Sequence, residues 1–79
     1  MNRVKLEERI SVRPDVQGGQ PCIKNTRMPV YAILEALATG LSFEQVKKEF
    51  APIDDQDIQA CIYYAAMLSN GREFFRQSA

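Results

Sequence analysis

The chain has 79 residues with ten basic and ten acidic side chains, two cysteines and no histidine, and this length predicts one domain near the lower size limit for a single hydrophobic core. Without an imidazole the usual general-base and metal-binding sites are excluded, so we expect a protein that is not an enzyme and holds no cofactor. The longest apolar run, residues 60–68, is far shorter than the roughly 18 residues of a membrane helix, and no signal-like start is present, which predicts a cytoplasmic protein.

The basic and acidic residues are unevenly distributed along the chain. Residues 1–27 carry six cations against three anions, a net charge of +3, and residues 28–79 carry four against seven, a net charge of −3. Because cations attract phosphate, the first third should hold any nucleic-acid contact, with two lysines of the later part as secondary contacts. The predicted phosphate-binding residues are Arg9, Arg13, Lys24, Arg27, Lys47 and Lys48.

The N-terminal third has the pattern of extended backbone. Residues 9–13 alternate polar and apolar side chains with a period of two, and a weaker alternation surrounds residues 22–24. The residues between these stretches include two prolines and two adjacent glycines, which are typical of a loop. The pattern predicts a basic extended segment or short β-hairpin over residues 1–28.

The two cysteines do not resemble a disulfide framework or a metal site. Cys22 and Cys61 are 39 positions apart, whereas a zinc site needs about four ligands with close paired spacing. We expect both to be buried small apolar residues.

Helical signals begin at Pro29. This proline suits the first helical position, residues 30–39 after it are rich in helix formers, and Gly40 is a left-handed stop. Ser42 followed three positions later by Gln45 is a capping box, which predicts a second helix from Phe43 to about residue 50, just before a proline at position 52.

A third helix should follow after a short turn. Asp54 is its predicted N-cap with Asp57 three residues on, and an Asn-Gly pair at positions 70 and 71 ends it near Ser69. Three helices joined by short turns match the plan of a trihelical helix-turn-helix domain. We therefore expect a mainly α fold, a single domain over residues 1–79 with a three-helix core at 29–69 and a tail at 70–79.

The start of the third helix does not favour DNA reading. Its first turns carry Asp55 and Asp57, whose carboxylates would repel phosphate. We interpret this helix as a packing element whose acidic start matches the helix dipole.

The run GGQPCIKNTRMPV at residues 18–30 resembles the signature of the domain of unknown function 433 family. Residues 33–42 and 57–66 are similar to that family's helical segments, so the resemblance covers about residues 9–68. The family usually has glycine where this chain has Asn25, and asparagine also tolerates a left-handed turn.

Some members of that family resemble VapB-type antitoxins, encoded beside a toxin with a PIN-like nuclease fold, and they are assigned to homeodomain-like helix-turn-helix folds. The resemblance implies a prokaryotic antitoxin-like regulator that binds such a toxin and, as a second ligand, operator DNA. The alternative is a dimeric protein-interaction module without nucleic-acid binding. Arg27 allows both interpretations, since it suits phosphate but can also pair with Glu35 or Asp57 and hold the N-terminal segment on the helices, the role that we favour.

Two apolar features predict protein partners. Within residues 30–39 only Glu35 and Thr39 are polar, and residues 60–68 are similarly uniform, so both helices should be buried all round, which a chain this short achieves only as a homodimer. The tail holds two adjacent aromatic rings between arginines. We expect these residues either to bind a partner or to pack on the domain itself: Arg72, Phe74, Phe75 and Arg76.

Overall fold

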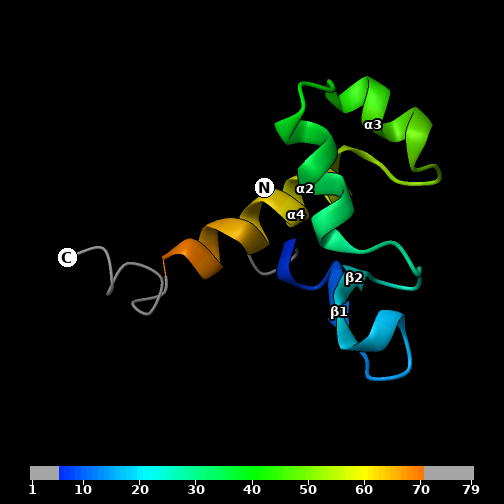
Figure 1. The fold of residues 1–79 in the computed structure, drawn as a ribbon, viewed down its shortest axis with the longest axis vertical. Coiled ribbons are helices and arrows are strands. Elements are labelled where there is room, and N and C mark those ends of the chain that lie inside the picture. The colour runs from blue at the N-terminus through cyan, green and yellow to red at the C-terminus, as the bar shows by residue number, and fades with distance from the viewer. Residues whose placement is uncertain (1–5, 71–79) are drawn as a thin grey trace.

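The computed structural model describes residues 6–70, which form a short antiparallel hairpin followed by three helices (Figure 1). Strand β1, Ile10–Val12, pairs with β2, Pro21–Ile23, so that Ile10 lies opposite Ile23 and Val12 opposite Pro21. This arrangement confirms the predicted mainly α fold with a short hairpin at its N-terminal side.

The loops on either side of β2 depend on left-handed backbone. A turn of 3-10 helix, η1 at Gln17–Gly19, connects the strands, and its glycines have φ angles of 63° and 88°. Asn25 has a φ of 63°, as expected for the position where asparagine replaces glycine. Thr26 Oγ1 donates to the Ile23 carbonyl at 2.6 Å and accepts from the Met28 N–H at 3.0 Å, which holds the turn that leads into the first helix.

Helix α2 spans Val30–Ala38. Pro29 was predicted to be the first helical residue, but it is the N-cap, one position earlier. The helix ends as expected at Gly40, whose φ is 104°. The N–H of Gly40 donates to the Leu37 carbonyl and that of Leu41 to the Ala36 carbonyl. These two bonds form a Schellman motif, which satisfies carbonyls that the end of the helix leaves open.

Reciprocal caps begin the next two helices at the predicted residues. At the start of α3, Phe43–Glu49, the Gln45 N–H donates to Ser42 Oγ at 3.1 Å and the Ser42 N–H to Gln45 Oε1 at 2.8 Å. At the start of α4, Asp55–Ser69, Asp54 and Asp57 exchange the same two kinds of bond, at 2.8 and 3.1 Å. Each cap fixes the direction in which its helix leaves the preceding turn.

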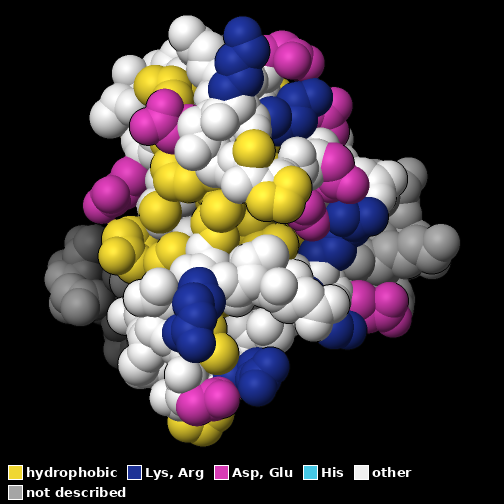
Figure 2. All heavy atoms as spheres, turned by 90° about the vertical axis from the view of Figure 1, so that its right-hand side faces the viewer, with side chains coloured by type: hydrophobic (Ala, Val, Ile, Leu, Met, Phe, Trp, Pro, Cys, Tyr) yellow, Lys and Arg dark blue, Asp and Glu magenta, His cyan; other side chains and the backbone are white. Residues whose placement is uncertain are grey.

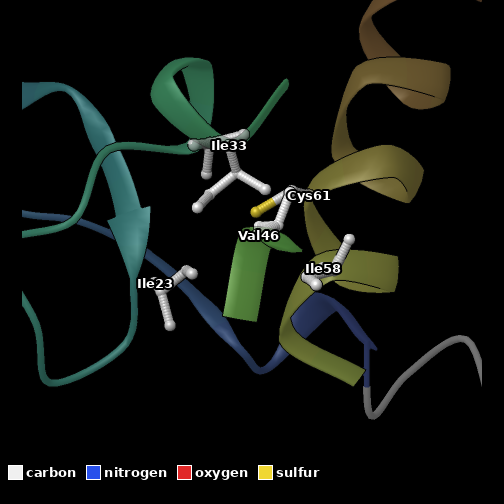
Figure 3. Packing of buried hydrophobic residues seen from close by; sticks show 6 residues of the cluster. Ile23, Ile33, Val46, Ile58 and Cys61 are labelled. Atoms are coloured by element: carbon white, nitrogen blue, oxygen red, sulfur yellow. The ribbon is translucent and has the colours of Figure 1, made fainter. Parts of the chain in front are cut away.

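The hydrophobic core joins the hairpin to all three helices. Figure 3 shows Ile33 of α2 pointing toward Cys61 of α4, with Val46 of α3 and Ile58 beside them and Ile23 of β2 at the edge. Ile33, Val46, Ile58 and Cys61 have no exposed surface. Because burying an aliphatic side chain stabilises a fold by roughly 1.5–3 kcal/mol, this cluster is the main source of stability in the described domain.

Candidate interaction surfaces

A cluster of hydrogen bonds ties the start of β1 to the start of α4. Arg9 donates from Nη1 to Asp57 Oδ1 at 2.9 Å and to Asp54 Oδ1 at 3.2 Å, and from Nη2 to Gln56 Oε1. The hydrogen bond to Asp57 is the main cause that raises the pKa of Arg9, so the guanidinium stays charged. Arg9 was predicted to bind phosphate, but in this structure its donors already face the carboxylates of α4.

The acidic start of α4 has an internal role. The N–H of Asp57 donates to Asp54, and this bond, together with the nearby Arg9 charge, lowers the pKa of the Asp54 carboxyl. Carboxylates at a helix N-terminus also interact favourably with the helix dipole. The geometry agrees with the packing role that the sequence suggested for this turn.

Lys47 also makes ion pairs, one within α3 and one to the start of α4. Its Nζ lies 3.1 Å from Glu44 Oε2 and 2.9 Å from Asp55 Oδ1, and the bond to Asp55 is the main cause that raises the pKa of Lys47. Lys48, the next residue, is exposed and makes no ion pair with residues 6–70. Of these two predicted secondary contacts, only Lys48 therefore has an ammonium group without an acidic partner.

The remaining predicted cations lie around the hairpin. Lys24 and Arg27 are exposed and make no ion pair with the described part of the chain, while Arg13 Nη2 lies 3.4 Å from Asp15 Oδ2 at an exposed position. The face of the molecule in Figure 2 has basic side chains on its lower part, where the hairpin lies, and also on its upper part, with hydrophobic side chains across its middle. Arg13 and Arg27 line the same open hollow.

The structural role favoured for Arg27 is wrong. Its side chain pairs with neither Glu35 nor Asp57, and its carbonyl accepts a hydrogen bond from Gln17 Nε2 at 3.0 Å. Arg9 makes the contact to Asp57 that was predicted for Arg27. The N-terminal segment is thus held on the helices as expected, but by a different arginine.

An apolar surface lies beside the second half of α4, residues 62–69. One groove, between β1 and α4, is lined by Val12 and Met67, and a second groove of about 310 Å³, between β2, α2 and α4, is lined by Tyr31 and Leu68. Tyr64 lines both grooves. We call this surface the α4 surface and define it by Val12, Tyr31, Tyr64, Met67 and Leu68.

The α4 surface is exposed because α4 extends beyond the hairpin and the helices that pack against it. Ile58 and Cys61 are fully buried, whereas Leu68, on the same helical face, is 57% exposed. Figure 1 shows the second half of α4 projecting away from the other elements. On α2, Tyr31 is also 53% exposed, so the single chain does not cover both apolar helices, and their burial by a second copy stays a prediction.

Both cysteines are buried and unpaired, as predicted. Burial raises the pKa of the Cys61 thiol to about 12, with a smaller contribution from the nearby Asp57 charge. Because the thiolate is the reactive form, Cys61 is an inert core residue at neutral pH.

Residues 6–70 contain no cluster of three or more histidine, cysteine or acidic side chains that could hold a metal ion. Within the same range, no helix has both the length and the apolar character needed to cross a membrane.

The family described as "Protein of unknown function (DUF433)" matches residues 10–65, from the first residue of β1 into the second half of α4. This chain belongs to the DUF433 family. It is 33% identical over 58 residues to the uncharacterized protein y4eO of Sinorhizobium fredii, and that match covers 73% of this chain and 26% of the relative.

The family fold is also present in a solved structure. A DUF433 member protein from Anabaena variabilis superposes with a TM-score of 0.72 at 26% identity, over 81% of this chain and 63% of that one. The chain thus spans about a quarter of the length of the curated relative, at 26%, and less than two thirds of the solved chain.

Sequence reasoning missed two features of these DUF433 surfaces. Gln56 accepts from Arg9 across 47 positions, and no periodic pattern connects residues so far apart. The hairpin residues Val12 and Pro21 border the two grooves, which only the docking of the hairpin against α4 determines. The predicted partner-binding residues Arg72, Phe74, Phe75 and Arg76 lie outside the described residues.

Proposed function

We propose that this DUF433 chain is a binding protein and not an enzyme: a cytoplasmic, antitoxin-like regulator whose α4 surface is an interface to another protein chain. One observation carries the proposal. Within residues 6–70 five large hydrophobic residues are exposed, and four of them, all except Ile62, lie on the α4 surface. Single exposed apolar residues are ordinary, but a contiguous group enriched in tyrosine, methionine and leucine is typical of an interface core.

The proposal includes a homeodomain-like helix-turn-helix arrangement of α2, α3 and α4. Short turns connect these helices at residues 39–42 and 50–54, as that arrangement requires. In a DNA reader of this class the last helix enters the major groove. Here Asp54 and Asp57 at the start of α4 are bound to Arg9, so we assign α4 to packing and protein binding.

The resemblance to antitoxins suggests a PIN-like nuclease toxin as a partner, with the tail residues Arg72, Phe74, Phe75 and Arg76 contributing to the contact. The test takes the PIN-like nuclease that this proposal expects in the neighbouring gene, titrates the full chain into it and measures RNA cleavage. We expect stoichiometric inhibition by the wild type and at least about tenfold weaker inhibition by Leu68→Glu, because a charge would disrupt the apolar α4 surface on which the assembly with a protein partner depends. A nuclease that stays fully active in excess wild-type chain contradicts the proposal.

Operator DNA is a second candidate ligand, and the exposed cations of the hairpin favour it. Lys24 and Arg27 have no acidic partner in the described chain, and a two-stranded ribbon fits the major groove. Binding to DNA from upstream of the gene should weaken steeply with salt, and Lys24→Ala or Arg27→Ala should each lower the salt slope by about one. Lys48→Ala tests a secondary contact, and Lys47→Ala, a cation already paired within the fold, is the control. No salt-dependent binding would favour the alternative, a protein-interaction module without nucleic acid.

A further inference from the structure

We propose that the α4 surface, which the proposed function assigns to a protein partner, is occupied by a second copy of this chain related by a two-fold axis. In this pairing the exposed end of each α4 lies on the α4 surface of the other copy. The proposal rests on the proposed function for the location of the interface and adds the identity of the occupant.

The first argument is the continuity of one helical face. Ile58, Cys61, Tyr64 and Leu68 follow one another at spacings of three and four positions, which places them on the same face of α4. Ile58 and Cys61 are covered by this chain's own core, but Leu68 is 57% exposed because the fold ends before it. The core-facing stripe therefore continues past the part of the chain that covers it within residues 6–70, where a second copy can cover it.

The second argument concerns shape. A two-fold interface brings one surface against itself, so it must contain both a projection and the recess that receives it. The projection is the end of α4 with Met67 and Leu68, and the recesses are the two grooves beside it. The α4 surface therefore has the self-complementary form that a symmetric dimer needs.

The third argument concerns charge. A side chain close to a two-fold axis meets its own copy, so any charge there would face an identical charge. From Ile58 to Asn70 the sequence has no charged residue, and the groove beside Tyr31 and Leu68 is also lined without one, while the groove beside Val12 and Met67 has one, Glu7. This low charge favours self-pairing, and the acidic residues of α4 lie at its opposite end.

The fourth argument is area. Large apolar residues expose roughly 150–250 Å² each when free. Val12, Tyr31, Met67 and Leu68 are 48–58% exposed, so together they present on the order of 400 Å². A stable interface uses about 800 Å² per partner, and in homodimers about 65% of that is apolar, roughly 500 Å². The exposed area is thus close to what one copy of a symmetric dimer supplies.

The test is sedimentation equilibrium of the full chain from about 1 to 200 µM, because mass action makes dimerisation depend on concentration. We expect the wild type to approach twice the monomer mass and Leu68→Glu to stay monomeric, with dissociation at least about tenfold easier. Ile62→Glu is the matched control, since Ile62 is 43% exposed on α4 but lines neither groove. Circular dichroism and thermal melting check that both variants are folded.

Three results would overturn the pairing: a wild type that stays monomeric, a dimer that Leu68→Glu leaves unchanged, or equal disruption by Ile62→Glu. The nuclease titration separates this failure from that of the proposed function. A monomeric wild type that inhibits the nuclease, while Leu68→Glu does not, keeps the proposed function and rejects self-pairing. If Leu68→Glu dissociates a wild-type dimer and the nuclease stays fully active in excess wild-type chain, self-pairing is supported and the antitoxin-like function is rejected.

Discussion

The two halves of α4 differ in both their amino-acid composition and their surroundings. Residues 55–61 carry the reciprocal cap, the contacts to Arg9 and three buried side chains, Ile58, Ala60 and Cys61. Residues 62–69 are more apolar, yet they contain no buried side chain. The comparison shows that an apolar helix sequence sets how much surface must be covered, while the fold decides how much of it the same chain covers.

Truncating an isoleucine in each half should give the largest difference. Ile58→Ala removes a fully buried side chain and should lower the free energy of unfolding by about 2–5 kcal/mol, measured by urea denaturation. Ile62→Ala, on the exposed side of the same helix, should change it by less than about 0.5 kcal/mol. If Ile58→Ala does not fold, Ile58→Val should still cost about 0.5–1.5 kcal/mol. Equal effects at both positions would contradict the contrast between the halves.

Thiol reactivity should separate the halves next. Cys61 is buried with a raised pKa of about 12, and Cys22 is buried too, so both should react with a disulfide reagent only after local or global opening. In the variant Ser69→Cys the added thiol lies at an exposed position and should react at least about a hundredfold faster than the two native ones. Fast reaction of the native thiols in the folded protein would show that the first half of α4 is not closed.

A smaller effect should come from the cap. Asp54→Ala removes the acceptor for the Asp57 N–H and should cost about 0.5–2 kcal/mol of stability. Asp15→Ala is the matched control, because Asp15 makes only an exposed contact of 3.4 Å to Arg13 and should change stability by less than about 0.5 kcal/mol. If the two variants are equally stable, the cap does not anchor α4 as the geometry indicates.

The smallest effect should be the acid dependence of the same residue. The folded-state pKa of Asp54 is lowered from its ordinary 3.8, mainly by the Asp57 N–H, so its charge stabilises the fold above that value and this stabilisation is lost as pH falls through the lowered pKa. Asp54→Asn keeps a capping oxygen without the charge. We expect the wild type to be more stable at pH 7 by less than about 1 kcal/mol and the difference to vanish near pH 2, measured by thermal melting. A difference that is constant across this range would assign the effect to something other than the charge.

The local structure of this protein could be predicted from its amino-acid sequence alone. Helix caps, helix stops and turns depend on contacts within a few residues of chain, so the sequence is enough to predict them. The examples here are the caps at Ser42 and Asp54, the stop at Gly40 and the turn at Asn25. The alternation of residues 9–13 likewise located the first strand, and the family resemblance was confirmed over residues 10–65.

Contacts between residues far apart in the sequence depend on how the elements pack, and local patterns did not predict them. Arg9 and Arg27 have the same side chain and both precede α2, yet Arg9 reaches Asp57 and Arg27 does not, because hairpin docking places the start of β1 beside the start of α4. The exposure of Leu68 could not be predicted from the sequence either. It depends on where the hairpin and α2 end beneath α4, and such a boundary is set by packing between elements, which no local pattern encodes.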